Sequence, residues 1–212
     1  MTQMKKIILF GDSIAAGLYQ GEVVHALDHA LSTTLNALGQ ADFKIINLGK
    51  RGDSTTSSLE RLSQLPQDER TADYVVLNVG VNDAINQRDN QEAYRKNLEQ
   101  LINFFKHSQV ILIGPSYIDE KIKTQTIPEI LVEYTQIAKE VADKNKVSFI
   151  DFYHYEKSFE DPTLYLQDDG LHPSKLGYHL LGALIAQCIQ QKEKNNLQTE
   201  YLNLCSTRSV DF

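Results

Sequence analysis

Ser13 stands where a side chain could carry out nucleophilic chemistry. It follows the apolar run 7–10 and the pair Gly11-Asp12. A buried strand that stops at a glycine turn presents the next side chain at the rim of a sheet. A serine hydroxyl is a poor nucleophile at neutral pH and needs a base to accept its proton. A nucleophilic role for Ser13 therefore requires a base, and hydrogen-bond donors to the attacked carbonyl, elsewhere in the chain.

Two of the six histidines have an aspartate three residues earlier, and these pairs are the candidate bases. They are Asp151 with His154 and Asp169 with His172. This spacing allows the carboxylate to bond the far ring nitrogen, which fixes the tautomer and stabilises the imidazolium. We favour Asp169/His172, because Pro173 at the first turn of the next helix anchors the loop before it. Asp151/His154 stays open as the alternative.

Three groups are candidate donors to the oxyanion that forms when a carbonyl is attacked. They are the backbone N–H of Ser13, the backbone N–H of Gly52 and the side-chain amide of Asn82. Gly52 has no side chain to obstruct a ligand. Each also has a structural interpretation: Gly52 as a turn glycine, and Asn82 with Asp83 as a turn pair.

Short apolar runs alternate with helical segments along the chain. The predicted strands span residues 6–10, 43–48, 74–79, 110–114 and 147–151. They are apolar on both faces, as buried parallel strands are. Strands alternating with helices predict a three-layer α/β/α fold with a doubly wound five-stranded parallel sheet of order 2-1-3-4-5. The carboxyl edge of such a sheet binds ligands, and the candidate residues all follow strands at that edge.

Apolar residues at helical spacing predict helices between the strands. They span residues 24–38, 93–105, 127–143 and 175–190, and a further helix capped by Ser54 or Thr55 runs to about Leu65. In the last helix the predicted buried stripe is Leu176, Leu180, Leu184 and Cys188. Polar residues follow, so we expect a domain over 1–192 and a peripheral or partly disordered extension over 193–212.

Four sequence blocks together resemble the SGNH hydrolase superfamily, the GDSL-type lipases and esterases. The blocks are Gly11-Asp12-Ser13-Ile14, Asn47-x-Gly49-x-x-Gly52-Asp53-Ser54, Gly80-Val81-Asn82-Asp83 and Asp169-Gly170-Leu171-His172-Pro173. Each follows its expected strand, and the similarity spans residues 6–190. The serine motif differs from the Gly-x-Ser-x-Gly of ordinary α/β-hydrolases, because Ala15 stands in place of the second glycine.

The resemblance implies roles for the site residues and a flavodoxin-like fold. Ser13 is then the nucleophile, His172 the base and later the acid, and Asp169 the residue that orients His172. Ser13, Gly52 and Asn82 form the oxyanion hole. The resemblance implies no metal and no cofactor. Asp12, Asn47 and Asp83 are expected to hold the loops by hydrogen bonds.

The predicted function is a serine ester hydrolase that acts through an acyl-enzyme on small or short-chain esters. An acyltransferase or thioesterase with the same triad is the alternative, and a non-catalytic nucleotide- or flavin-binding module is a weaker one. Segments 85–91 and 116–125 are expected to wall an open, shallow pocket. Tyr117, Ile118 and Tyr165 are candidates either to line it or to pack.

Net charge and hydropathy limit the classes of partner that the protein is expected to have. The formal net charge of -7 argues against nucleic acid and against anionic membranes. The apolar run after Lys6 is too short for a signal peptide or a membrane span. We therefore expect a cytoplasmic protein with no stable membrane association, whose partner is a small-molecule ester. The sequence carries no signal of oligomeric state.

Overall fold

A five-stranded parallel sheet forms the centre of the protein, which we describe from a computed structural model. The structure describes residues 4–40, 42–86 and 88–207, and side chains up to residue 198. The strands are β1 (Lys5–Gly11), β4 (Phe43–Gly49), β5 (Tyr74–Asn78), β6 (Gln109–Ile113) and β7 (Ser148–Ile150). Their order is β4-β1-β5-β6-β7. This confirms the predicted fold and order, with each strand within one residue of its predicted ends.

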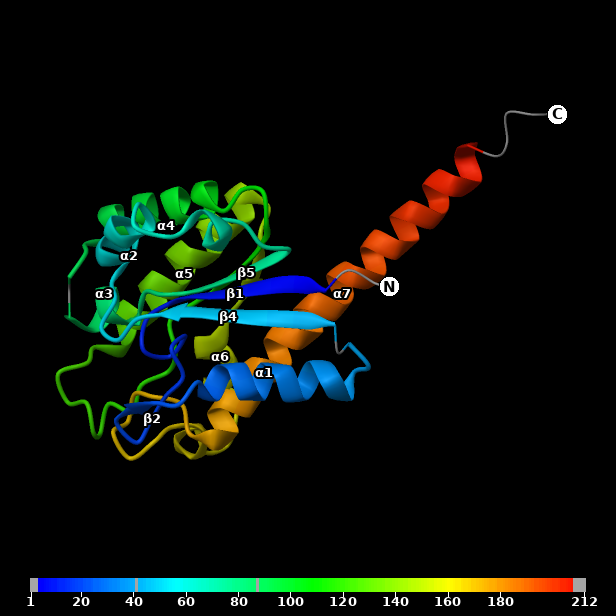
Figure 1. Cartoon of the computed structure of the whole chain (residues 1–212). Helices are drawn as coiled ribbons and strands as arrows, with labels where there is room; N and C mark the ends of the chain where they lie inside the picture. Colours follow the sequence, from blue (N-terminus) through cyan, green and yellow to red (C-terminus); the bar gives the residue numbers. More distant parts are fainter. Residues whose placement is uncertain (1–3, 41, 87, 208–212) are drawn as a thin grey trace.

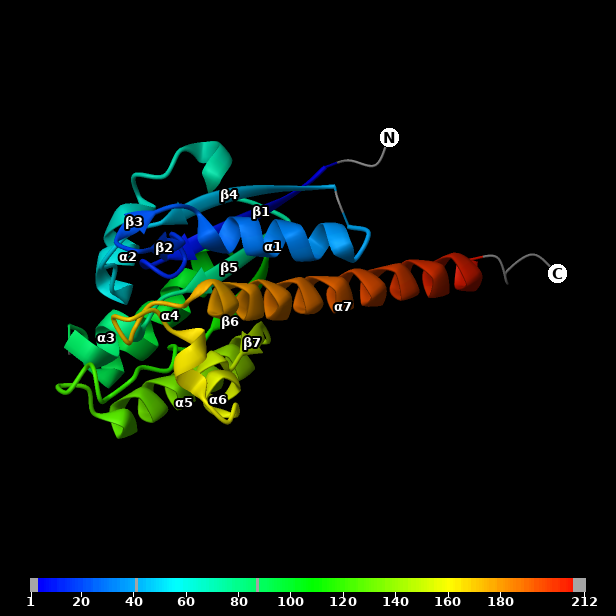
Figure 2. The ribbon, with the colours of Figure 1, turned by 90° about the horizontal axis from the view of Figure 1, so that it is seen from below.

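Helices cover both faces of the sheet (Figures 1 and 2). On one face α1 (Ala26–Ala37) packs along α7 (Lys175–Thr207). On the other lie α2 (Thr55–Leu62), α4 (Gln91–Phe104) and α5 (Pro128–Asn145). The remaining short elements are α3 (Val81–Asn86), α6 (Phe152–Lys157), the 3-10 turns 67–69 and 162–165, and a hairpin of β2 (Leu18–Tyr19) and β3 (Glu22–Val23).

The apolar strands build the core between these layers. Ile7, Ile8, Leu9 and Phe10 of β1 have no exposed surface. Phe10 meets Phe105, at the end of α4, edge to face with ring centroids 5.6 Å apart. Strand β4 is the exception, because it lies at the edge of the sheet and is only half-buried.

The predicted buried stripe of the last helix is wrong. Leu176 is 48% exposed, and Leu180, Leu184 and Cys188 are only partly buried. The buried stripe is instead Tyr178, Leu181, Ile185 and Ile189. Both stripes are apolar at helical spacing, so the periodicity alone does not select between them.

Helix ends also differ from the predictions. Helix α7 continues to Thr207 rather than ending at Gln190. The expected extension 193–212 thus begins inside this helix, while residues 208–212 lie outside the described residues. Helix α1 ends before Leu38, which is 40% exposed. Helix α2 ends at Leu62, and its N-cap is Ser54.

The carboxyl ends of β1, β4 and β5 carry the turns with Ser13, Gly52 and Asn82, as expected for this topology. The turn with Asp169 and His172 lies just before α7. In the part of the chain that the structure describes, no helix is both long and apolar enough to cross a bilayer.

Candidate active site

Ser13, His172 and Asp169 form a hydrogen-bonded chain. Ser13 Oγ lies 2.9 Å from His172 Nε2, and His172 Nδ1 lies 2.5 Å from Asp169 Oδ2. The other carboxylate oxygen of Asp169 accepts the backbone N–H groups of Leu171 and His172 at 3.0 and 2.9 Å. Because the carboxylate binds both the ring and the backbone of its partner, the imidazole is held toward the serine. This arrangement can activate a hydroxyl by general-base catalysis.

The charge state of Asp169 suits this role. Burial raises the pKa of the carboxyl, but hydrogen bonds from the His172 ring, the His172 N–H and the Leu171 N–H outweigh burial, and the net pKa is lowered. Asp169 is therefore ionised at neutral pH and can stabilise an imidazolium on His172.

A tight turn after β1 presents Ser13. Gly11 has φ +154°, and a Cβ there would lie 1.9 Å from the carbonyl oxygen of Asn78. The next residue, Asp12, accepts the N–H of Ile14 at 2.8 Å, and its carbonyl accepts the N–H of Ala16 at 2.9 Å. Ser13 is thus at the start of a helical turn, with its N–H free to point toward a ligand.

The three candidate oxyanion donors come from the turns after β1 and β4 and from the first turn of α3, after β5. In the part of the chain that the structure describes, the N–H groups of Ser13 and Gly52 have no hydrogen-bond acceptor. Gly52 has φ +72° and open space around it, so a glycine is favoured there. The Asn82 amide donates one hydrogen to the Asp53 carbonyl at 3.0 Å, which leaves its second hydrogen for a ligand.

The residues expected to hold the loops do so. Asn47 Nδ2 donates to the Ala15 carbonyl at 2.8 Å, and Asn47 Oδ1 accepts the Gly49 N–H at 2.8 Å. Asp83 accepts the N–H of Thr55 at 3.0 Å, which joins the start of α3 to the start of α2. These bonds fix the turns after β1, β4 and β5 relative to one another.

Two of the carboxyl groups beneath the site have raised pKa values. Burial raises the pKa of Asp12 to about 7, and burial likewise raises the pKa of Asp83 to about 7. In Asp89, burial is outweighed by hydrogen bonds from Thr56, and its pKa is lowered. Asp89 Oδ1 accepts the Thr56 hydroxyl at 2.6 Å. Asp12 and Asp83 thus bind a proton more readily than exposed carboxyl groups do.

The alternative pair is also formed but does not reach a nucleophile. His154 Nδ1 lies 2.8 and 2.9 Å from the two carboxylate oxygens of Asp151. The His154 side chain is 56% exposed, whereas that of His172 is 14% exposed. Within the described residues, no serine, threonine or cysteine side chain bonds the other nitrogen of His154. The structure therefore pairs Ser13 with His172.

Sequence reasoning missed Arg61, which binds the turns around Ser13 and Gly52. Its Nε lies 2.6 Å from Asp53 Oδ2, and its Nη2 donates to the Gly11 carbonyl at 3.1 Å. The spacing of Asp53, Ser57 and Arg61 at four-residue intervals was a signal that all three lie on one side of a helix start.

Among the described cavities, one of about 500 Å³ is lined by Asp169 together with residues 19–21. Another, of about 290 Å³, lies near the oxyanion side of the site. It is lined by Ile85 and Asn86 of α3 and by residues 122–126. Asn86 Nδ2 donates to Asn82 Oδ1 at 3.3 Å, so this cavity begins one helical turn from the candidate hole. The candidate liners Ile118 and Tyr165 instead pack: Ile118 is buried in the core, and Tyr165 stacks on Phe159.

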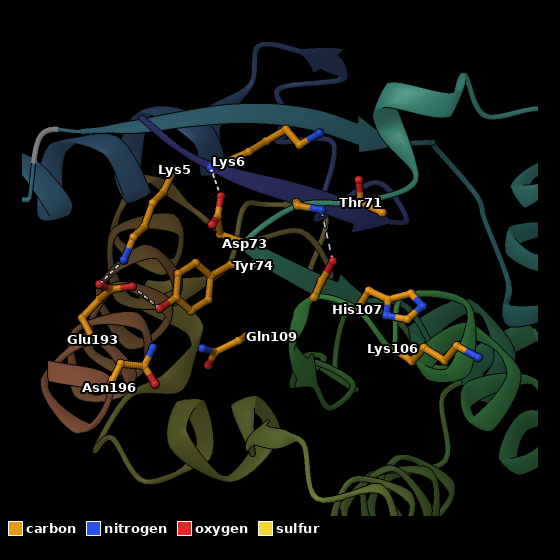
Figure 3. Close-up of a pocket in the computed structure, with 12 residues that line it drawn as sticks. Lys5, Lys6, Thr71, Asp73, Tyr74, Lys106, His107, Gln109, Glu193 and Asn196 are labelled. Atoms are coloured by element: carbon orange, nitrogen blue, oxygen red, sulfur yellow. Dashed lines mark hydrogen bonds and ion pairs between the residues drawn. The ribbon is translucent and has the colours of Figure 1, made fainter. Parts of the chain in front are cut away.

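A larger cavity, of about 560 Å³, lies at the opposite end of the sheet. Figure 3 shows it at the start of β1 and β5, where Lys5 and Tyr74 both point toward Glu193 of α7. It contains none of the candidate site residues, and we assign the chemistry to the carboxyl edge.

The sequence matches the model of the GDSL-like Lipase/Acylhydrolase family over residues 9–180. The chain belongs to this family. Members are lipases and acylhydrolases, so the protein is a carboxylic ester hydrolase. A comparison with curated proteins gave no match.

Solved structures agree with this membership. A lipase/acylhydrolase from Enterococcus faecalis is 36% identical, with a TM-score of 0.83 over 89% of this chain and 97% of that one. An acetylxylan esterase from Geobacillus stearothermophilus is 21% identical, with a TM-score of 0.68 over 87% of this chain and 94% of that one. The second likeness, at such low identity, concerns the fold alone.

Proposed function

We propose that the protein hydrolyses small, short-chain carboxylic esters through an acyl-enzyme on Ser13. One observation carries the proposal, namely the 2.9 Å contact of Ser13 Oγ with His172 Nε2, whose other ring nitrogen is held by Asp169. A serine, a base and an orienting carboxylate in this order are the parts that nucleophilic acyl transfer needs.

In the first half of the reaction, Ser13 Oγ attacks the ester carbonyl while its proton passes to His172 Nε2. The carbonyl electron pair moves to oxygen, and the N–H groups of Ser13 and Gly52 and the Asn82 amide donate to it. When the intermediate collapses, the bond to the alcohol oxygen breaks, and His172 gives that oxygen its proton. The alcohol leaves, and the acyl group stays on Ser13.

In the second half, His172 takes a proton from a water molecule as the water attacks the acyl-enzyme. The same three donors hold the second oxyanion. Collapse breaks the bond to Ser13 Oγ, which recovers its proton from His172. A carboxylic acid is released, and the enzyme returns to its starting state without a redox step.

The cavity lined by Asn86 supports the proposal of a short acyl group. Its volume of about 290 Å³ lies at the lower limit of small-molecule sites. Its lining mixes Ile85 and Ile122 with the polar residues Asn86 and 123–126, and its small volume is what favours a small acyl group over a long alkyl chain. The acetyl substrate named for the Geobacillus stearothermophilus esterase is of this size.

Covalent labelling tests the nucleophile. We expect a fluorophosphonate probe to modify the wild-type protein once, on the peptide that contains Ser13, and to leave the Ser13→Ala variant unlabelled. Wild-type protein that stays unlabelled, or equal labelling of the variant, would refute the proposal.

A series of p-nitrophenyl esters tests the substrate size. We expect kcat/KM to be highest for acetate or butyrate and to fall by at least tenfold at decanoate. A maximum at decanoate would contradict the short-chain proposal while leaving the triad untouched.

A further inference from the structure

Arg61 occupies a buried position between the two turns that carry Ser13 and Gly52. The Arg61 side chain is 14% exposed, and its Asp53 partner is 1% exposed. Its guanidinium carbon lies 3.8 Å from the ring centroid of Phe10, the last residue before Gly11. A planar cation stacked on a ring and bonded in its plane has little freedom to move.

The contacts of Arg61 join two backbone segments. Nη2 donates to the Gly11 carbonyl, two residues before Ser13, and that carbonyl also accepts the Lys50 N–H at 2.9 Å. Arg61 Nε donates to the carboxylate of Asp53, the residue directly after Gly52. The turn with Gly52 is therefore attached to the turn with Ser13 on both sides, through Lys50 and through Asp53.

Asp53 extends this connection to the third donor. Its carboxylate also accepts the hydroxyl groups of Ser57 and Ser58, each at 2.9 Å, and its carbonyl accepts the Asn82 amide. Gly52 is thus one residue from the ion pair, Asn82 is one hydrogen bond from it, and Ser13 is two residues from the Gly11 carbonyl that Arg61 bonds. A charge pair this buried does not tolerate loss of one partner, since the remaining carboxylate must move toward other donors or water.

We infer that Arg61, through Asp53 and the Gly11 carbonyl, positions the oxyanion hole and so sets the rate of the chemical step. This inference rests on the proposed function. Arg61 does not touch the substrate and is a positioning residue. Its loss is expected to displace Gly52 and Asn82, which weakens binding of the developing oxyanion more than binding of the ground-state ester.

The test compares Arg61→Gln and Arg61→Lys with a matched control, Arg70→Gln. Within the described residues, the Arg70 side chain donates to the carbonyls of Leu65 and Ser63, in the loop after α2, and to no group of the site. Each protein is first titrated with a fluorophosphonate to count working sites. Then kcat per titrated site and KM are measured with p-nitrophenyl acetate.

For Arg61→Gln we expect full titration, a fall in kcat of about 100-fold and a KM within about threefold of wild type, as for loss of one oxyanion donor. For Arg61→Lys we expect a fall of about tenfold, because an ammonium cannot bond Asp53 and Gly11 in the same fork geometry. Arg70→Gln is expected to match wild type.

A purely structural role would give a different result. It would lower the titre and leave kcat per titrated site unchanged, and that outcome would overturn the inference. If Arg61→Gln does not fold, Arg61→Lys decides alone, and a kcat per site equal to that of Arg70→Gln would overturn it. Failure of the proposed function can be distinguished from failure of this inference, because in that case the wild-type protein would not be labelled at Ser13.

Discussion

The molecule contains two Asp-x-x-His turns with nearly the same local geometry and different surroundings. In each, the aspartate bonds the ring Nδ1 and the backbone N–H of the histidine three residues later. Only the Nε2 of His172 faces a hydroxyl, whereas His154 is mostly exposed on α6. The comparison shows that a local motif supplies an oriented imidazole, and that tertiary structure decides whether it can activate a nucleophile.

Replacing each histidine gives the largest expected difference. His172→Ala should lower kcat by about 10⁴-fold or more, since Ser13 then has no base. His154→Ala should stay within about twofold of wild type. Steady-state hydrolysis of p-nitrophenyl acetate measures both, and the opposite ranking would transfer the base to the Asp151/His154 pair.

Replacing each aspartate gives a smaller difference. Asp169→Asn should lower kcat by about 10²- to 10⁴-fold, because the amide favours the wrong tautomer of His172 and cannot stabilise its cation. Asp151→Asn should leave kcat unchanged. Equal activity of the two variants would mean that Asp169 serves only to cap its turn.

The capping role, in contrast, should be common to both turns. Asp151→Ala and Asp169→Ala each remove the acceptor of backbone N–H groups, so each should lower the free energy of unfolding by about 1 kcal/mol. Urea unfolding at neutral pH measures this. A stability loss in only one variant would show that the turns differ in structure as well as in chemistry.

The smallest expected effect is on the pH dependence of stability. Burial raises the pKa of Asp169, but the hydrogen bonds from His172 and Leu171 lower it by more, so the pKa is lowered overall. The contribution of ionised Asp169 to the free energy of unfolding is therefore present above its pKa in the unfolded chain, about 4. It is lost as the pH falls through its pKa in the folded protein. Because the side chain is 42% exposed, we expect less than about 1 kcal/mol. Unfolding free energies of wild type and Asp169→Asn should converge as the pH falls below about 4, and a constant difference would contradict this.

The sheet could be predicted because its strands are short apolar runs with turns at both ends. The same reasoning failed for α7, where Leu180 and Leu181 are both apolar and periodicity alone does not say which one is buried. It also gave no sign of the two-residue hairpin at Leu18 and Glu22, which is too short to show alternation. Local patterns determine element type better than they determine which face packs.

For the site, the sequence predicted the residues and favoured one histidine, but it could not show the contact between nucleophile and base. Ser13 is 159 residues from His172 in the chain, and only the fold brings the two side chains together. Asp151/His154 had the same spacing; Pro173 at the start of the next helix favoured Asp169/His172 but did not exclude the other pair. Arg61 was missed because a single arginine on a predicted helix is ordinarily an exposed charge.

Helix α7 also has a practical consequence for handling the enzyme. It begins three residues after His172 and continues for 33 residues, a length of about 50 Å at 1.5 Å per residue. Figures 1 and 2 show it projecting past the sheet on the side where β1 begins. A support attached beyond this helix would hold the protein with its catalytic edge turned to the bulk solution. Immobilisation through the C-terminal end should therefore keep full access for substrates.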